Sequence, residues 1–114
     1  MKPAAFRHFA PASLADALSL MGAHAPEARV LAGGQSLVPM MNFRLARPEI
    51  LIDLNHVSDL AYIRDAGDRL EIGAMTRERD IETSDLVRAA VPLLYRATTQ
   101  IGHLPIRSRG IGRR

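Results

Sequence analysis

Residues 30–37 read Val30-Leu31-Ala32-Gly33-Gly34-Gln35-Ser36-Leu37. The apolar run that begins at Ala28 stops at two glycines, and a helical pattern starts directly after them. Glycine has no Cβ, so both positions are free to take positive φ and to let the backbone approach a bound group closely. The stretch therefore predicts a buried strand over 28–32, a tight glycine loop and a helix.

The loop has the chemistry of an anion site. The N–H groups of Gly34, Gln35 and Ser36 are expected to point outward unpaired, and the dipole of the following helix favours a negative charge there. Gln35 adds an amide and Ser36 a hydroxyl, so a diphosphate is the natural ligand. The alternative is a tight strand–helix turn that binds nothing. The loop matches neither GxGxxG nor GxxxxGK[ST], which argues against a Rossmann site and a P-loop.

The elements around this loop follow from spacing. Residues 6–11 are expected to be extended, and Ser13 is a suitable N-cap, with Asp16 three residues later, for a helix that ends at Gly22. The second helix has Ser36 as its cap and Pro39 in its first turn, and Arg47-Pro48 ends it. Its expected core face is Leu37, Met40, Met41 and Leu45. A further strand covers 50–54.

The second half of the chain begins with a hairpin signal. Two apolar segments, 60–64 and 69–75, flank the turn residues 65–68. Thr76 is interpreted as the cap of a helix over 77–81, followed by a helix over 84–90 and one that runs from 94 to 101. The order β–α–β–α–β–ββ–α–α predicts an α+β fold with a small mixed sheet and packed helices, without the regular βαβαβ alternation of a doubly wound sheet.

Composition excludes several classes of site. The 114 residues suffice for one compact domain and contain no cysteine, so disulfides, Fe–S ligation and cysteine nucleophiles are excluded in this sequence. The four histidines are far apart, so no local metal motif is expected, and no catalytic triad or carboxylate dyad is evident. No apolar run reaches about 18 residues and no signal peptide is visible. We expect a cytoplasmic protein without a membrane partner.

The basic end of the sequence leaves an alternative open. The last eight residues contain Arg107, Arg109, Arg113 and Arg114 and no acid. Such a stretch is typical either of a solvated or unfinished end or of a segment that binds nucleic acid or acidic lipid. No aromatic or Gly-Arg repeat accompanies it, so we expect no nucleic-acid partner. Asp53 and Asn55 are interpreted as turn formers at a strand end, and His103 as a surface-loop residue.

Residues 31–41 also resemble the flavin loop of the FAD-binding (medium) subunits of molybdenum hydroxylases, the family of carbon monoxide dehydrogenase and xanthine dehydrogenase. The likeness continues through residues 45–48, 51–55, 72–76, 101–102 and 106–110, and so covers nearly the whole chain in register. It implies the first subdomain of a two-subdomain FAD-binding fold. It also implies a subunit that takes electrons from an Fe–S partner and passes them to NAD or another acceptor.

The resemblance assigns site residues and partners. It places the FAD pyrophosphate against Ala32, Gly33, Gly34, Gln35 and Ser36, with Leu31 and Leu37 beside them, Ile101 near the flavin and Gly110 before a second phosphate loop. FAD would have half of its site in this chain, which would supply no catalytic residue and no metal ligand. The molybdenum cofactor and the 2Fe-2S clusters would belong to a large molybdenum subunit, which oxidises the substrate, and a small Fe–S subunit.

The sequence departs from the family pattern after Gly110. It reads Ile111-Gly112-Arg113-Arg114 where the family's second loop reads Thr-Ile-Gly-Gly. Residues 1–110 are therefore expected to form an incomplete flavin domain, inactive alone, with 111–114 as an aberrant basic tail. The alternative is a truncated, non-enzymatic folding or interaction module that does not bind flavin independently.

Overall fold

The computed structural model describes residues 2–101 and 104–110, and for residues 104, 105 and 108 the backbone alone. The chain divides into two compact units, Met1–Asp59 and Leu60–Arg114. The expected tail at 111–114 and His103 lie outside the described residues. Among the described residues, no helix has both the length and the apolar character needed to cross a membrane.

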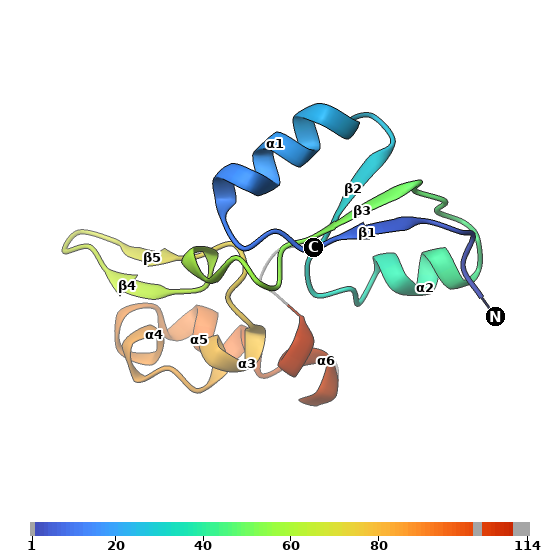
Figure 1. Ribbon diagram of the computed structural model, residues 1–114. Coiled ribbons are helices and arrows are strands. Elements are labelled where there is room, and N and C mark those ends of the chain that lie inside the picture. Colours follow the sequence, from blue (N-terminus) through green and yellow to red (C-terminus); the bar gives the residue numbers. More distant parts are fainter. Residues whose placement is uncertain (1, 102–103, 111–114) are drawn as a thin grey trace. The chain divides into compact units, whose positions relative to one another are not determined.

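The first unit is built on a three-stranded parallel sheet. Its strands β1 (Arg7–Phe9), β3 (Ile50–Asp53) and β2 (Ala28–Leu31) lie in that spatial order, so β3 is central. Helices α1 (Leu14–His24) and α2 (Leu37–Asn42) lie on opposite sides of the strands (Figure 1). Burial on both faces explains the continuous apolar run of β3, whose Ile50, Leu51 and Ile52 are all buried.

Helix α1 begins as predicted and ends later. The Ser13 hydroxyl accepts a hydrogen bond from the Asp16 N–H at 3.1 Å, which confirms the N-cap. The expected end at Gly22 is wrong, because the helix continues to His24 and stops before Pro26, which has no N–H to continue the ladder. Ala17 is the buried residue of this helix, and it packs in a core cluster with residues of β2 and β3.

Two expectations for the segment around the glycine loop are wrong. Strand β2 is not a buried strand: it is an edge strand with one neighbour, so only Ala28 is buried and Val30 is 40% exposed. Helix α2 ends at Asn42 rather than near residue 47, since Arg44 adopts a φ of 55° and the chain turns away. Leu45 is therefore outside the helix and exposed. The buried residue of α2 is Met41.

The described part of the second unit combines a hairpin with four short helices. Strands β4 (Ile63–Asp65) and β5 (Leu70–Ile72) pair antiparallel around Gly67, which confirms the predicted hairpin. A single 3-10 turn, η1 (Ser58–Leu60), precedes them, and the helices are α3 (Glu78–Glu82), α4 (Asp85–Ala90), α5 (Pro92–Thr98) and α6 (Leu104–Arg109). The α+β class is confirmed, with the strands divided between two small sheets, one parallel and one antiparallel.

Three predictions in this unit need correction. Thr76 does not cap a helix, because its buried hydroxyl is used by both the N–H and the carbonyl of Tyr62, at 3.2 and 2.9 Å. The helix expected from 94 to 101 runs from Pro92 to Thr98, with proline in the first turn, where its missing N–H costs nothing. Helix α6 was not predicted at all, and it contains two of the arginines that we assigned to a basic end.

Candidate functional site

The glycine loop spans residues 32–36, between the last residue of β2 and the first of α2. Gly34 has a φ of 77°, and Gly67 is the only other glycine in the described ranges with a positive φ. A Cβ at Gly34 would lie 3.2 Å from Cγ2 of Val38 and 3.5 Å from Cδ1 of Leu31. Both the backbone conformation and the crowded surroundings therefore favour glycine at this position. Gly33 does not use the positive φ that is open to it.

The loop keeps its amide donors available. The N–H groups of residues 33–37 donate no hydrogen bond to any described residue. The carbonyls are used instead: that of Gly34 accepts the Val38 N–H at 3.1 Å, and that of Ser36 accepts the Met40 N–H at 3.3 Å. A run of unpaired N–H groups is a set of donors for an anion with several oxygens, such as a diphosphate. The predicted cap is wrong, since the Ser36 hydroxyl makes no cap hydrogen bond and stays exposed.

Asn55 ties the loop to the central strand. Its side-chain Nδ2 donates to the Ala32 carbonyl at 3.0 Å and to Oδ1 of Asp53 at 2.6 Å. The other carboxylate oxygen of Asp53 lies 3.1 Å from Nε2 of His8 on β1. The Asn55 N–H also donates to Oδ1 of Asp53 at 2.9 Å, which confirms that the two residues form a turn at the strand end. The sequence did not reveal that Asn55 also anchors the loop 23 residues away.

The electrostatics of this anchor are set by hydrogen bonding. Partial burial acts to raise the pKa of Asp53, but the hydrogen bonds from the Asn55 N–H and side chain outweigh it, and His8 adds to them. The net result is a pKa below the ordinary value of 3.8. Asp53 is therefore a carboxylate at neutral pH, and its two oxygens are occupied by Asn55 and His8.

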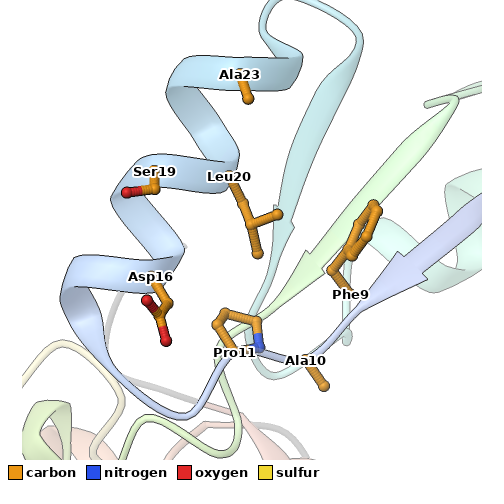
Figure 2. Close-up of a pocket in the computed structure, with 7 residues that line it drawn as sticks. All are labelled: Phe9, Ala10, Pro11, Asp16, Ser19, Leu20 and Ala23. Carbon is orange, nitrogen blue, oxygen red and sulfur yellow. The ribbon is translucent and has the colours of Figure 1, made fainter.

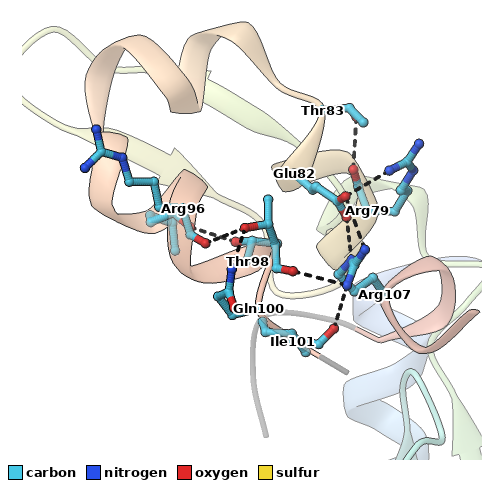
Figure 3. A network of polar contacts seen from close by, with 10 residues as sticks. Arg79, Glu82, Thr83, Arg96, Thr98, Gln100, Ile101 and Arg107 are labelled. Carbon is cyan, nitrogen blue, oxygen red and sulfur yellow. Dashed lines mark hydrogen bonds and ion pairs between the residues drawn. The ribbon is translucent and has the colours of Figure 1, made fainter. Parts of the chain in front are cut away.

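The other two predicted site residues belong to the second unit. Ile101 follows α5, and its N–H donates to the Thr98 carbonyl at 3.1 Å. Its own carbonyl accepts a hydrogen bond of 3.0 Å from Nη1 of Arg107, whose Nε lies 2.6 Å from Oε2 of Glu82 (Figure 3). The side chains of Arg107 and Glu82 are each only 13% exposed. For Arg107, the interpretation as part of a solvated basic end is wrong.

Gly110 is buried where α3 begins. Its carbonyl accepts the Glu78 N–H at 2.8 Å, and its N–H donates to the Ile106 carbonyl at 2.6 Å. A Cβ at Gly110 would lie 2.9 Å from that carbonyl oxygen and 3.0 Å from Oε2 of Glu78. This carboxylate oxygen is buried and has no hydrogen-bond partner among the described residues. The lack of room for a Cβ between these two oxygens thus explains the glycine at position 110.

The seven predicted site residues from Leu31 to Leu37 form one continuous segment. Leu31, Ala32, Gly33, Gly34 and Leu37 are partly buried, while Gln35 and Ser36 are exposed. Gln35 folds back weakly, with its Nε2 3.4 Å from the Gly33 carbonyl. Sequence reasoning missed Asn55 as the loop's anchor. It also missed Arg107 as a contact of Ile101 and Glu82 as the ion-pair partner of Arg107. The acid Glu82 three residues after Arg79 was the available signal for an ion-pair cluster.

Two hollows among the described residues of the first unit lie beside other segments than the loop 32–36. One, of about 530 Å³, lies where α1 faces the end of β1 and is lined by Phe9, Pro11, Asp16 and Leu20 among others (Figure 2). Another, of about 690 Å³, lies beside α2 and shares only Leu37 with the predicted site. Within the described residues, no group of three His, Asp or Glu side chains is placed to hold a metal ion.

Comparison with known proteins points to one family. Residues 4–111 match the family described as FAD binding domain in molybdopterin dehydrogenase. The carbon monoxide dehydrogenase medium chain of Hydrogenophaga pseudoflava is 44% identical over 110 residues, which are 96% of this chain and 38% of that relative. The caffeine dehydrogenase subunit beta of Pseudomonas sp. (strain CBB1) is 40% identical over 110 residues, again 96% of this chain and 37% of that relative.

Solved structures agree with these matches. Carbon monoxide dehydrogenase from Hydrogenophaga pseudoflava superposes with a TM-score of 0.95 and 44% identity, covering 97% of this chain and 39% of that chain. Quinoline 2-oxidoreductase from Pseudomonas putida 86 gives a TM-score of 0.93 and 39% identity. The chain thus spans less than two fifths of the length of these relatives. The resemblance inferred from the sequence is confirmed, and the alternative of a non-enzymatic interaction module is not favoured.

Proposed function

We propose a function from one premise: this chain belongs to the family of FAD-binding domains in molybdopterin dehydrogenases. The proposal is that residues 32–36 hold the pyrophosphate of FAD, in a flavin subunit that relays electrons from an Fe–S partner to NAD or another acceptor. The observation that carries it is the run of unpaired N–H groups over residues 33–37, next to the positive φ of Gly34.

The residues present fit a diphosphate. The segment 30–38 contains no acidic side chain, so no negative charge in the loop opposes the anion. The nearest acid in the anchor, Asp53, has its oxygens engaged by Asn55 and His8. Helix α2 has only six residues, so we assign the binding to the loop amides themselves rather than to a helix dipole.

The division of labour follows from what the chain contains. FAD, when bound, supplies the chemistry that accepts and passes on electrons. The protein's own part is to bind and orient it: the amides of residues 33–37 meet the pyrophosphate, and Gln35 and Ser36 are exposed donors beside it. We propose that the molybdenum cofactor and the 2Fe-2S clusters are carried by a large and a small partner subunit.

Flavin binding is tested by titrating FAD with the 114-residue chain and following the quenching of flavin fluorescence. We expect saturable quenching that ADP competes away, because the proposed contacts are made to the pyrophosphate. Riboflavin, which has no phosphate, should compete poorly. Equal competition by riboflavin and ADP would contradict the assignment of the loop to the pyrophosphate.

The electron relay needs a complete flavin subunit. In a chimera, residues 1–110 of this chain replace the matching segment of the Hydrogenophaga pseudoflava medium chain, which is then assembled with the other subunits of that enzyme. Addition of carbon monoxide should bleach the flavin absorbance, and NAD or an artificial acceptor should restore it. Bound flavin that is not bleached, in an assembly whose Fe–S clusters are reduced, would refute the relay while leaving FAD binding intact.

A further inference from the structure

We propose that Arg107 is a positioning residue for the flavin-facing turn that ends α5. Its guanidinium fixes the backbone at Ile101, and Glu82 on α3 holds the guanidinium in place. The inference rests on the proposed function, because the resemblance alone places Ile101 near the flavin. Arg107 itself is assigned no contact with FAD.

The geometry of the cluster supports this role. Arg107 donates from Nη1 to the carbonyls of Thr99 and Ile101, at 3.4 and 3.0 Å (Figure 3). On its other side it donates to Glu82, from Nε at 2.6 Å and from Nη2 at 3.4 Å. The guanidinium therefore binds a carboxylate on one edge and a main-chain turn on the other, which the planar fork of arginine permits and the point charge of lysine does not.

Further contacts link α3 and its N-cap residue to α6 and to the residue that follows it. The Arg79 guanidinium also binds Glu82, at 3.0 Å, so the carboxylate is fixed by two cations. At the far end of α6, Nη1 of Arg77 donates to the Arg109 carbonyl, and the Glu78 N–H donates to that of Gly110 at 2.8 Å. Glu82 on α3 thus reaches Ile101 through Arg107, and Glu78 on α3 contacts Gly110 directly. Ile101 and Gly110 are the two candidate site residues of this unit.

A purely stabilising role explains the cluster less well. Buried ion pairs offset much of their attraction by desolvation, so a pair that is mostly hidden from solvent is weak evidence for stability. The Arg107 side chain of this pair also donates a hydrogen bond to the carbonyl oxygen of Ile101. The N–H of Ile101 already donates to the carbonyl of Thr98. Both polar groups of the Ile101 backbone are consequently fixed, and the turn has one defined conformation.

The test compares variants of the 114-residue chain. Arg107→Lys keeps the charge and loses the fork, and Glu82→Gln keeps the size and loses the charge. Glu71→Gln is the control, because Glu71 forms an ion pair of 2.5 Å with Arg64 on the hairpin, away from Ile101 in the same unit. Two quantities are measured: hydrogen–deuterium exchange of the Ile101 amide without flavin, and the dissociation constant for FAD.

We expect both Arg107→Lys and Glu82→Gln to speed exchange at Ile101 and to weaken FAD binding, each by about tenfold, the effect of losing one charge-assisted hydrogen bond. Glu71→Gln should change neither. Unchanged exchange at Ile101 in both variants would overturn the inference, and so would an equal change caused by Glu71→Gln, since that would reveal a general loss of stability. Where Arg107→Lys does not fold, Glu82→Gln carries the same comparison.

The exchange measurement needs no flavin and therefore separates the two proposals. A parent chain that does not quench FAD fluorescence would contradict the proposed function, and the exchange result would then decide alone whether Arg107 holds Ile101. A parent that binds FAD, with variants that exchange faster at Ile101 but bind FAD equally well, would leave the proposed function intact. It would overturn Arg107 as a positioning residue for the flavin.

Discussion

The two units of this chain hold their candidate flavin segments by different means. In the first unit, the loop 32–36 connects strand β2 to helix α2, whose main-chain hydrogen bonds fix the two ends of the loop. One side chain, that of Asn55, also holds it. In the second, the turn at Ile101 is held by a charged side chain that comes from a different helix and is braced by an acid on a third. The first arrangement leaves the N–H groups of residues 33–37 available to a ligand. In the second, both the N–H and the carbonyl of Ile101 are hydrogen-bonded within the protein.

The difference matches the ligand chemistry proposed for each segment. A pyrophosphate needs several donors at once, which a loop supplies only if its amides have no partner within the protein. A residue that packs near a flavin ring needs no free donor, but it needs a fixed position. We therefore expect changes in the loop to act on flavin affinity directly, and changes at Arg107 or Glu82 to act on it only through the position of Ile101.

The largest expected effect is on FAD affinity, and it distinguishes Gly34 in the loop from Gly67 in the hairpin turn. Gly34→Val should lower FAD affinity by at least about 100-fold, because a β-branched side chain resists positive φ and crowds Val38; the unfolding free energy should fall by about 1–2 kcal/mol. Gly67→Val is the matched control, since Gly67 also has a positive φ, 91°, but open space around it. It should cost similar stability and leave FAD titrations unchanged. Equal FAD binding by Gly34→Val and the parent would remove the loop from the site.

The second prediction concerns the anchor. Asn55→Ala should weaken FAD binding by about tenfold and lower the unfolding free energy by about 1 kcal/mol, because the Ala32 carbonyl loses its side-chain donor. Asn55→Asp should do the same, since a carboxylate has no proton to donate. The neighbouring exposed His56→Ala is the control. Urea unfolding and FAD titration check both quantities, and an unaltered affinity in Asn55→Ala would mean that the loop keeps its shape without the anchor.

A smaller effect distinguishes three serines at helix starts. Ser13 and Ser84 each cap a helix, by accepting the N–H of Asp16 and of Val87 at 3.1 and 3.2 Å. Replacing either by alanine should cost about 1 kcal/mol of stability, one in each unit. Ser36→Ala should cost no stability, because its hydroxyl makes no cap hydrogen bond, and should lower FAD affinity only slightly. Thermal melts that rank Ser36→Ala with the two caps would contradict this.

The smallest effect is a dependence on pH. The pKa of Asp53 lies below its ordinary value of 3.8 in the folded chain, so the unfolded state binds the proton more readily. The stabilisation is therefore complete above the ordinary pKa and is lost as the pH falls through the folded pKa, a contribution below about 1 kcal/mol for a partly exposed group. Urea unfolding at several pH values should show that the unfolding free energy of Asp53→Asn falls less steeply at acidic pH than that of the parent. Asn55→Ala should show part of this change. An identical pH dependence in Asp53→Asn and the parent would exclude Asp53 as the titrating group.

The sequence by itself determined the local structure that depends on neighbouring residues. The glycine loop, the Ser13 cap and the hairpin around Gly67 were all predicted, because turn and cap preferences act over a few residues. The α+β class and the family followed from the order of elements and from motifs spread along the chain. Even here the ends of elements were less certain, as α1 continued past Gly22 and α2 stopped at Asn42.

Only the tertiary structure decided which residues face each other across long separations. An apolar run does not tell whether its strand is central or at an edge, so β2 was wrongly expected to be buried, while β3 is the strand covered on both faces. Arg107 looked like part of a solvated end, because its partner Glu82 lies 25 residues earlier. Asn55 became an anchor only when parallel pairing of β2 with β3 brought their carboxyl ends to the same edge, beside Ala32. The ends of parallel strands meet in space and not in sequence, and the loop of the candidate site begins there.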